Sequence, residues 1–600
     1  MPVADVPRVD IHELAAGRTV ASNFVTTVDE RPSGTALRWQ SEAGWESLSY
    51  ADYARRVACA AAGLRELGLQ PGDRVALMMR NVPEFHVIDL AVTFCGGTPI
   101  SIYNSSSTEQ IEYLVGHSRA SLAILEDQSF LERFRVARAQ LSAIRAVGSL
   151  RGDSDFSYAD LLAHSPIDLD AAASAVDPSH LATVIYTSGT TGAPKGVMVT
   201  HGQVVFTMLS LLAALDTTRD EHAGLRVMSY LPMAHIAERM ISQYSAVYCG
   251  YEVTTCPDMG LVGSYLREVR PQVFMGVPRV WEKLYAGVMA ALAADPVRKT
   301  QFDDGVAAAA PIVDARTWNR STEADDATWA FLDEVAFAPV RRTLGLDALV
   351  TAVSSAAPIP PELVTWFRSI GVPLSELYGM SESCGPITWS PLRPKAGTVG
   401  APIPACDVRL AEDGEVICRG GNVFLGYLDD AARTAEALDA DGWLHTGDIG
   451  AFDADGYLRI VDRKKELIIT AGGKNISPSN LEAKLKMVPL IGQAVAIGDN
   501  RPYVTALVVL DPDHVRTFAS SHAIEYASLA ELAHDPRVHD AIAIGIEDAM
   551  VNFSHAERIK RFVILGDDWL PDSDELTPTS KLKRRAIHAK YAAQIESMYD

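Results

Sequence analysis

Residues 186–196, with the sequence YTSGTTGAPKG, combine the residue types that suit the binding of a phosphate group. An apolar run precedes this segment, and a helical pattern follows it from about Thr200. Glycines let a backbone turn sharply and approach a ligand closely, and the N–H groups of such a turn form an anion-binding concavity. The hydroxyls can donate to phosphate oxygens, and Lys195 adds a positive charge. The spacing differs from G-x-x-x-x-G-K-S/T, so the segment is not the common P-loop.

Further segments carry polar side chains of types that take part in catalysis or ligand binding. Considered alone, each has an ordinary structural interpretation: a histidine that begins a helix, a loop of small residues, a strand end, a turn, a solvated charge run and a basic tail. The segments are LPMAHIAER (231–239), SSAAPI (354–359), ELYGMSE (376–382), DGWLHTGD (441–448), DRKKE (462–466) and LTPTSKLKR (576–584).

Together, and in this order, these segments resemble the superfamily of AMP-forming acyl- and aryl-CoA synthetases, peptide-synthetase adenylation domains and firefly-type luciferases. TSGTTGAPKG is the most specific signature, and the resemblance spans roughly residues 35–595. It is strongest to bacterial, actinobacterial-like long-chain fatty acyl-CoA synthetases. Two positions depart from the usual pattern: Ser381 stands where threonine is more frequent, and Ser580 stands where glycine is more frequent.

The resemblance implies an activity and its partners. A fatty-acid carboxylate would attack the α-phosphorus of ATP, with Mg²⁺ present, to give an acyl-adenylate and pyrophosphate. The thiol of coenzyme A would then attack the acyl carbon and release AMP. The enzyme would be a long-chain fatty-acid–CoA ligase whose partners are small molecules, and a small C-terminal domain would rotate between the two half-reactions.

The resemblance also implies which residues carry this chemistry. The catalytic residues would be Lys195, His235, Glu382 and Lys581, with His235 beside the substrate carboxylate. Thr187 and Glu382 would hold Mg²⁺, a hard cation that prefers oxygen ligands. Lys581 would stabilise the charge that develops on the phosphates during adenylate formation.

The nucleotide site follows from the same matches. Tyr378 would stack on adenine while Glu376 accepts from its amine, and Asp448 would accept from the two ribose hydroxyls. Lys465 matches the hinge of the family. The implied cofactor-binding residues are Thr187, Ser188, Gly189, Thr190, Thr191, Gly192, Lys195, Ala356, Ala357, Pro358, Glu376, Leu377, Tyr378, Gly379, Met380, Ser381, Asp448, Arg463, Lys465 and Lys581.

Other functions stay open at this point. An acyl-AMP ligase that passes the acyl group to a carrier protein would share every ATP-binding residue. An aryl or short-chain CoA ligase would differ in the shape of its acyl pocket. A non-catalytic acyl-binding protein on the same fold is a third alternative, although the joint presence of Lys195, Glu382, Asp448, Arg463 and Lys581 argues against it.

The elements that must position these residues can be predicted from the hydrophobic pattern. Apolar runs such as RVALMM (74–79), LAILED (122–127) and LATVIYT (181–187) alternate with helical patterns, which predicts parallel sheets covered by helices. Residues 293–345 interrupt this alternation and predict a helical insertion. Shorter strands follow after about 395, and Ser479 with Glu482 fits a capping box.

We therefore expect an α/β protein with two domains. The large domain, 1–463, would hold the mostly parallel sheets and a small barrel-like β part. The small α+β domain, 464–600, would be mobile and would carry Lys581. A chain of 600 residues is too long for one hydrophobic core.

Composition and charge indicate the compartment of the protein and the kinds of partner that it binds. The net charge is 53 − 76 = −23, which opposes non-specific binding to nucleic acid. The seven cysteines include no C-x-x-C pair, as expected for a reducing compartment. Neither a secretory signal nor a membrane-spanning run is evident, so we expect a cytoplasmic protein. Peripheral contact with the inner face of the membrane and a homodimer stay open.

Overall fold

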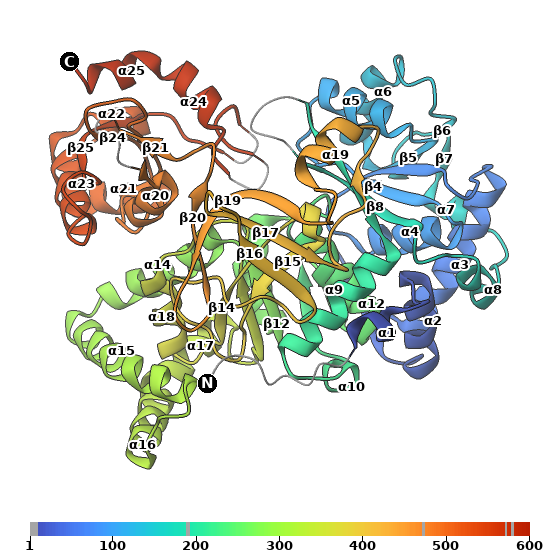
Figure 1. Cartoon of the computed structure of the whole chain (residues 1–600), viewed down its shortest axis with the longest axis horizontal. Helices are drawn as coiled ribbons and strands as arrows, with labels where there is room; N and C mark the ends of the chain where they lie inside the picture. Colours follow the sequence, from blue (N-terminus) through green and yellow to red (C-terminus); the bar gives the residue numbers. More distant parts are fainter. Residues whose placement is uncertain (1–9, 188–192, 471–474, 571–572, 578–580) are drawn as a thin grey trace.

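The computed structural model describes residues 10–187, 193–470, 475–570, 573–577 and 581–600. A large body holds the chain from blue through yellow to light orange, and the C-terminal segment, in deep orange and red, forms a smaller unit beside it (Figure 1). Mostly parallel sheets in the large body confirm the α/β class that the sequence predicts. Among the described residues, no helix is both long and apolar enough to cross a membrane.

One sheet is parallel throughout, in the strand order β4-β3-β5-β6-β7. Val75 and Leu77 of β3 face one hydrophobic core, whereas Ala76 and Met78 face another. Burial on both faces explains why this strand is a continuous apolar run. The elements are β3 (Arg74–Met78), β4 (Thr98–Ser101), β5 (Leu122–Asp127), β6 (Ala146–Arg151) and β7 (Phe156–Ser157), with α4 (Pro83–Phe94), α5 (Thr108–Ser118) and α6 (Gln128–Arg138).

A second sheet has the order β15-β14-β13-β12-β10-β11-β1-β2. Strands β14 to β1 pair in parallel, and only the pairs at the two edges are antiparallel. The carboxyl ends of the parallel strands therefore lie along one edge, where ligands bind in such sheets. The strands are β1 (Thr35–Ser41), β2 (Gly44–Ser49), β10 (Arg226–Ser229), β11 (Glu252–Thr255), β12 (Val273–Gly276), β13 (Thr351–Ser354), β14 (Leu374–Met380) and β15 (Gly385–Trp389).

Two paired strands flank the glycine-rich segment in the sequence. Strand β8 (Leu181–Thr187) pairs antiparallel with β9 (Lys195–Thr200), and Thr187 faces Lys195. Strand β18 (Gly426–Tyr427) adds to β9. The sequence predicts the strand before the loop and the helix after it, α9 (His201–Ala214), which Thr200 caps; it misses β9. Residues 188–192 lie outside the described residues.

An antiparallel half-barrel sheet forms the small β part that the sequence predicts. Its order is β16-β17-β19-β20. The last two strands place Asp448 opposite Arg463, because residues that pair across antiparallel strands lie directly opposite each other. The strands are β16 (Cys406–Leu410), β17 (Glu415–Gly420), β19 (Leu444–Phe452) and β20 (Leu458–Arg463).

Helices occupy the region between β12 and β13, including residues 293–345. They project from the large body at the lower left of Figure 1. Proline occupies the first turn of three of them, where its missing N–H is not needed. They are α14 (Pro278–Ala293), α15 (Pro296–Thr317), α16 (Glu323–Leu332), the π-helical stretch η3 (Asp333–Phe337) and α17 (Ala338–Leu344).

The C-terminal unit is built on the sheet β23-β24-β25. Alternate residues of β23 point to two separate cores, one containing Ala494 and the other containing Val495. This unit therefore has its own hydrophobic interior on both faces of its sheet. The boundary at 463/464 stays a prediction. The elements are α20 (Pro478–Leu485), β23 (Ile491–Ile497), β24 (Val504–Leu510), α21 (Pro512–Ser521), α23 (Pro536–Ala549), β25 (Ile559–Leu565), α24 (Arg584–Lys590) and α25 (Ala592–Ser597).

Candidate active site

One cavity of about 1440 Å³ lies at the carboxyl ends of β12, β13 and β14 and between the two units. Every predicted site residue that the structure describes lines it. Ser188, Gly189, Thr190, Thr191 and Gly192 lie outside the described residues. The residues brought together are Thr187, Lys195, His235, Ala356, Ala357, Pro358, Glu376, Leu377, Tyr378, Gly379, Met380, Ser381, Glu382, Asp448, Arg463, Lys465 and Lys581.

Tyr427, which the sequence did not single out, joins two of these residues. Its hydroxyl donates to Oε1 of Glu382 at 2.8 Å, and the ammonium of Lys195 lies 3.5 Å from the hydroxyl oxygen and 4.5 Å from the ring centre. Burial, followed by the Glu382 carboxylate, raises the pKa of Tyr427. The hydroxyl therefore keeps its proton and acts as a donor, which fixes the orientation of Glu382.

The oxygen atoms at this end of the cavity fit a magnesium ion. Glu382 supplies a carboxylate and Thr187 a hydroxyl, both hard ligands. Among the described residues, no group of three or more His, Cys, Asp or Glu could hold a metal. Mg²⁺ commonly binds through one or two carboxylates together with the phosphates of a substrate, so a sparse donor set of this kind suits it.

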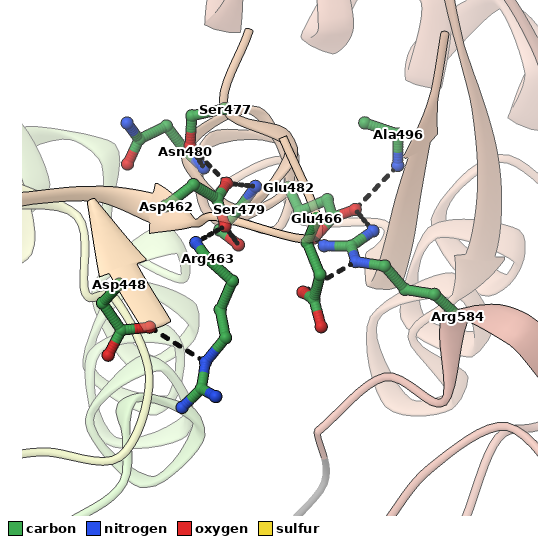
Figure 2. A network of polar contacts seen from close by, with 10 residues as sticks. All are labelled: Asp448, Asp462, Arg463, Glu466, Ser477, Ser479, Asn480, Glu482, Ala496 and Arg584. Atoms are coloured by element: carbon green, nitrogen blue, oxygen red, sulfur yellow. Dashed lines mark hydrogen bonds and ion pairs between the residues drawn. The ribbon is translucent and has the colours of Figure 1, made fainter. Parts of the chain in front are cut away.

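Asp448 accepts contacts on both of its oxygens. Tyr378 donates to Oδ2 at 2.7 Å, and Nε of Arg463 lies 2.9 Å from Oδ1 (Figure 2). Burial raises the pKa of Asp448, although Arg463 and Tyr378 oppose that effect. Since each carboxylate oxygen can accept a further hydrogen bond, the predicted contact with a ribose remains compatible with these partners.

Glu376 presents an unsatisfied acceptor to the cavity. Its Oε2 is buried and has no hydrogen-bond partner among the described residues. Burial raises the pKa of its carboxyl group to about 8, against the effect of the N–H groups of Ile359 and Gly397. A ligand N–H donor would satisfy this oxygen, as an exocyclic amine does.

The small-residue loop after β13 also approaches the cavity. Ala356 has a φ of 76°, in the left-handed region that residues with a Cβ rarely adopt. Such strain is typical of functional loops. The sequence predicts a turn of small residues here, but it does not predict the positive φ of Ala356.

His235 caps the short helix α11 (Ile236–Glu238). Its Nδ1 accepts from the N–H of Ala237 at 3.2 Å, so the proton of the neutral ring resides on Nε2. Burial, followed by the positive charge of Lys581, lowers the pKa of His235 to about 3. The ring is therefore neutral and has one N–H to donate. His235 can therefore serve both as a helix cap and as a hydrogen-bond donor beside a substrate carboxylate.

Lys581 lies in the same cavity. Its backbone N–H donates to Oγ1 of Thr577 at 2.9 Å. Its side chain lines the cavity and is exposed to the solvent there. Desolvation, followed by repulsion from Arg463, lowers the pKa of Lys581, while Asp448 and Glu382 oppose this. The ammonium is thus within electrostatic reach of the residues predicted to bind the nucleotide.

Arg584 is not part of a free basic tail, the ordinary interpretation of that segment. It binds both oxygens of Glu482 at 2.6 and 2.7 Å and Oε2 of Glu466 at 3.2 Å (Figure 2). Glu482 also accepts from the N–H of Ala496 at 2.8 Å. This network ties the Lys581 segment to α20 and to the loop after β20.

The predicted capping box at Ser479 and Glu482 is wrong. Ser477 caps α20 instead, and Pro478 occupies its first position. Both Ser477 and Ser479 donate their hydroxyls to Asp462, at 2.7 and 3.1 Å. The tertiary partners of Ser479 and Glu482 therefore override the local pattern.

Apolar side chains form one part of the cavity wall, which we call the apolar arm. They come from helix α9, from the segments that follow His235, and from strand β12 and the residue after it. Those segments are α11, the π-helical stretch η1 (Arg239–Ser245) and α12 (Ala246–Cys249); π-helical turns often occur at functional sites. The arm is lined by Met208, Leu211, Leu212, Leu215, Met240, Ile241, Cys249, Tyr251, Val273, Met275 and Val277.

Comparison with known families accounts for most of the chain. Residues 24–428 match the AMP-binding enzyme family. Residues 465–600 match the AMP-binding enzyme C-terminal domain.

Among curated relatives, the chain is 44% identical over 457 residues to a putative fatty-acid–CoA ligase, fadD11, of Mycobacterium tuberculosis, covering 75% of this chain and 79% of the relative. It is 35% identical over 569 residues to the long-chain-fatty-acid–CoA ligase FadD15 of Mycobacterium bovis, covering 93% of each.

Solved structures share the fold. The A domain of a carboxylic acid reductase from Segniliparus rugosus, in complex with AMP and a carboxylic acid, superposes with a TM-score of 0.75 at 18% identity, covering 98% of this chain and 96% of that one. The anthranilate CoA ligase AuaEII with anthranoyl-AMP gives a TM-score of 0.73 at 17% identity, covering 97% and 98%.

Proposed function

Since this chain belongs to the AMP-binding enzyme family, we propose that it joins a long-chain fatty acid to coenzyme A through an acyl-adenylate. The observation that carries this proposal is a single cavity lined by both kinds of group. The apolar arm lines it, and so do His235, Glu382, Asp448 and Lys581. The relatives named as fatty-acid–CoA ligases support the same activity.

In the first half-reaction, a carboxylate oxygen bonds to the α-phosphorus of ATP, and the bond to the pyrophosphate leaving group breaks. Mg²⁺, held by Glu382 and Thr187, would neutralise phosphate charge when bound. Lys581 and Lys195 place their ammonium groups where negative charge develops, and such preorganised charges lower the barrier. The Nε2 proton of His235 is available to orient the carboxylate.

Side chains in the cavity that can still accept hydrogen bonds would orient the nucleotide. Glu376 accepts from the adenine amine, which satisfies its unpartnered Oε2. Asp448 accepts from the ribose, and its contacts with Tyr378 and Arg463 hold it in place. The loop that contains Ala356 brings backbone close to the ligand.

The apolar lining of the arm supports a long acyl chain. Eleven side chains from α9, from the segments after His235 and from β12 and the residue after it form this lining. Each methylene that such a lining removes from water contributes about 0.8 kcal/mol. The free energy of binding should therefore become more favourable as the acyl chain lengthens.

In the second half-reaction, the thiol of coenzyme A attacks the acyl carbon and AMP leaves. We propose that the C-terminal unit, from about residue 464, rotates about Lys465 between the steps. Lys581 would leave the site at that point, which opens a path for the thiol. The arrangement described here, with Lys581 in the cavity, corresponds to adenylate formation.

The test is ATP-dependent AMP release with straight-chain acids from C2 to C20, with and without coenzyme A. We expect kcat/KM to rise steeply from C6 to C12 and then to flatten or fall, with acyl-CoA as the product. A peak at acetate or benzoate would overturn the long-chain assignment. Acyl-adenylate that accumulates with coenzyme A present, and is consumed only by a carrier-protein thiol, would identify an acyl-AMP ligase. Acid binding without AMP release would identify a non-catalytic protein.

A further inference from the structure

Among the described residues, three ion pairs connect the large body to the C-terminal unit. Nη2 of Arg279 lies 2.6 Å from Oδ2 of Asp511. Nζ of Lys484 lies 2.5 Å from Oε1 of Glu362. Nζ of Lys486 lies 3.7 Å from Oε1 of Glu282. None of these residues has a role in the chemistry proposed above.

Each surface carries charges of both signs, so the pairs favour one register of docking. The large body contributes a cation from α14 and anions from α14 and from α18 (Pro361–Ser369). The C-terminal unit contributes the opposite charge at each position, from α20, the residue after it, and the cap of α21. A slide of one surface along the other would bring like charges together, which is costly.

Glu282 has a second countercharge only when the units are docked. Its side chain is 6% exposed, and neither of its carboxylate oxygens has a hydrogen-bond partner among the described residues. Arg279 of the same helix lies 3.6 Å away, and Lys486 of the C-terminal unit lies 3.7 Å away. Because a buried carboxylate is stabilised by nearby positive charge, Lys486 favours the docked arrangement.

A continuous path leads from these pairs to the catalytic lysine. Lys484 lies on α20, as does Glu482, and Glu482 holds Arg584 at 2.6 and 2.7 Å (Figure 2). Arg584 follows Lys581 by three residues. Docking of α20 on Glu362 and Glu282 therefore sets the position of the segment that carries Lys581.

From this geometry we propose that Lys484, Lys486 and Arg279 are positioning residues that dock the C-terminal unit in the adenylate-forming arrangement and so place Lys581. The inference rests on the proposed function, because it assigns these residues to one half-reaction. They do not touch the reacting atoms. Their loss should slow adenylate formation and leave thioester formation as fast or faster.

The test uses the pair Lys484–Glu362, whose residues form no other described ion pair. In the full-length protein, Lys484→Glu and Glu362→Lys are each compared with the double exchange. Pyrophosphate release without coenzyme A measures adenylate formation, and acyl-CoA formed from synthetic acyl-AMP measures thioester formation. Each single variant should slow the first reaction roughly three- to tenfold, as expected for a partly exposed pair with reversed charge, and the double exchange should restore it.

A matched control separates docking from general charge effects. Lys299→Glu breaks an ion pair of 2.5 Å with Asp303 inside α15, a helix that contributes no residue to the three docking pairs, and should change neither half-reaction. Lys486→Glu should behave as Lys484→Glu does. Unchanged adenylate formation in the single variants, equal slowing of both half-reactions, or failure of the double exchange to restore the rate would overturn the positioning role. Wild-type protein that forms no acyl-adenylate would instead refute the proposed function, and the positioning role with it.

Discussion

The hydroxyl of Tyr427 donates to Oε1 of Glu382 at 2.8 Å, and the same ring lies 4.5 Å from the ammonium of Lys195. Tyr427 belongs to β18, which pairs with the strand that begins at Lys195. Glu382 comes from the turn after β14. One aromatic side chain thus joins the strand after the glycine-rich loop to the carboxylate predicted to bind metal.

Tyr427→Phe should weaken the use of magnesium. The variant keeps the ring beside Lys195 but removes the hydrogen bond that orients Glu382. A hydrogen bond to a charged group contributes about 1.5–3 kcal/mol, so we expect kcat/KM for Mg·ATP to fall roughly 10- to 100-fold. A magnesium titration of AMP release measures this effect.

A matched tyrosine provides the control. Tyr503→Phe removes a 3.0 Å hydrogen bond to the carbonyl of Met598 within the C-terminal unit and should leave the magnesium titration unchanged. If Tyr427→Phe gave the wild-type titration curve as well, the orientation of Glu382 would not depend on this contact.

Lys581→Ala should separate the two half-reactions. Loss of one preorganised donor to developing charge lowers the rate by about 10²–10³, and we expect that loss in adenylate formation. Acyl-CoA formation from synthetic acyl-AMP should stay near the normal rate. Lys465→Pro, by stiffening the proposed hinge, should show the reverse pattern. Equal slowing of both steps in Lys581→Ala would contradict the rotation of the C-terminal unit.

Cys249→Phe should shorten the preferred acyl chain. Cys249 is buried and lines the apolar arm, and we expect a phenyl group there to displace two to three methylene sites. Each buried methylene contributes about 0.8 kcal/mol, so turnover of palmitate should fall roughly 15- to 60-fold. Octanoate is the internal control, because a shorter chain should lose fewer of its contacts. Equal losses for both acids would show that Cys249 does not limit the length of the acyl chain.

Glu376→Gln should change how stability depends on pH. The pKa of Glu376 is raised to about 8 by burial, from an ordinary value near 4.3 in an unfolded chain. Between these values the folded protein binds more protons than the unfolded chain, so the free energy of unfolding falls as pH rises. Glutamine cannot ionise and should remove this component.

The measurement is urea unfolding of both proteins, without nucleotide, from pH 5 to pH 9. The variant should gain stability relative to the wild type as pH rises through this range. A constant difference between the two proteins would show that Glu376 ionises at its ordinary pKa and is not desolvated.

Much of the scaffold could be predicted from local patterns. The predicted strands at 122–127 and 181–187 have the bounds of β5 and β8, because a strand buried on both faces is a continuous apolar run between polar turns. Arg463 and Lys581 could be assigned to one site only by resemblance. They are 118 residues apart, and no local pattern brings them together.

What the sequence missed depends on tertiary contacts. Strand β9 is short and becomes a strand through its pairing with β8 and β18. Tyr427 is one aromatic residue among many until the fold places it 2.8 Å from Glu382. The apolar arm is built from residues of α9, η1 and β12, each of which reads as ordinary core when it is considered alone.

The two-faced core of the C-terminal unit has a thermodynamic consequence. Its own helices cover both faces of β23-β24-β25, and its hydrophobic clusters share no residue with those of the large body. The ion pairs between the units join charged groups. Separating the units would hydrate these charges and expose little apolar surface. Exposure of apolar surface is the main source of a heat-capacity change, so this change should be small. If the C-terminal unit rotates as proposed, the balance between its docked and rotated arrangements should vary little with temperature and respond mainly to ionic strength.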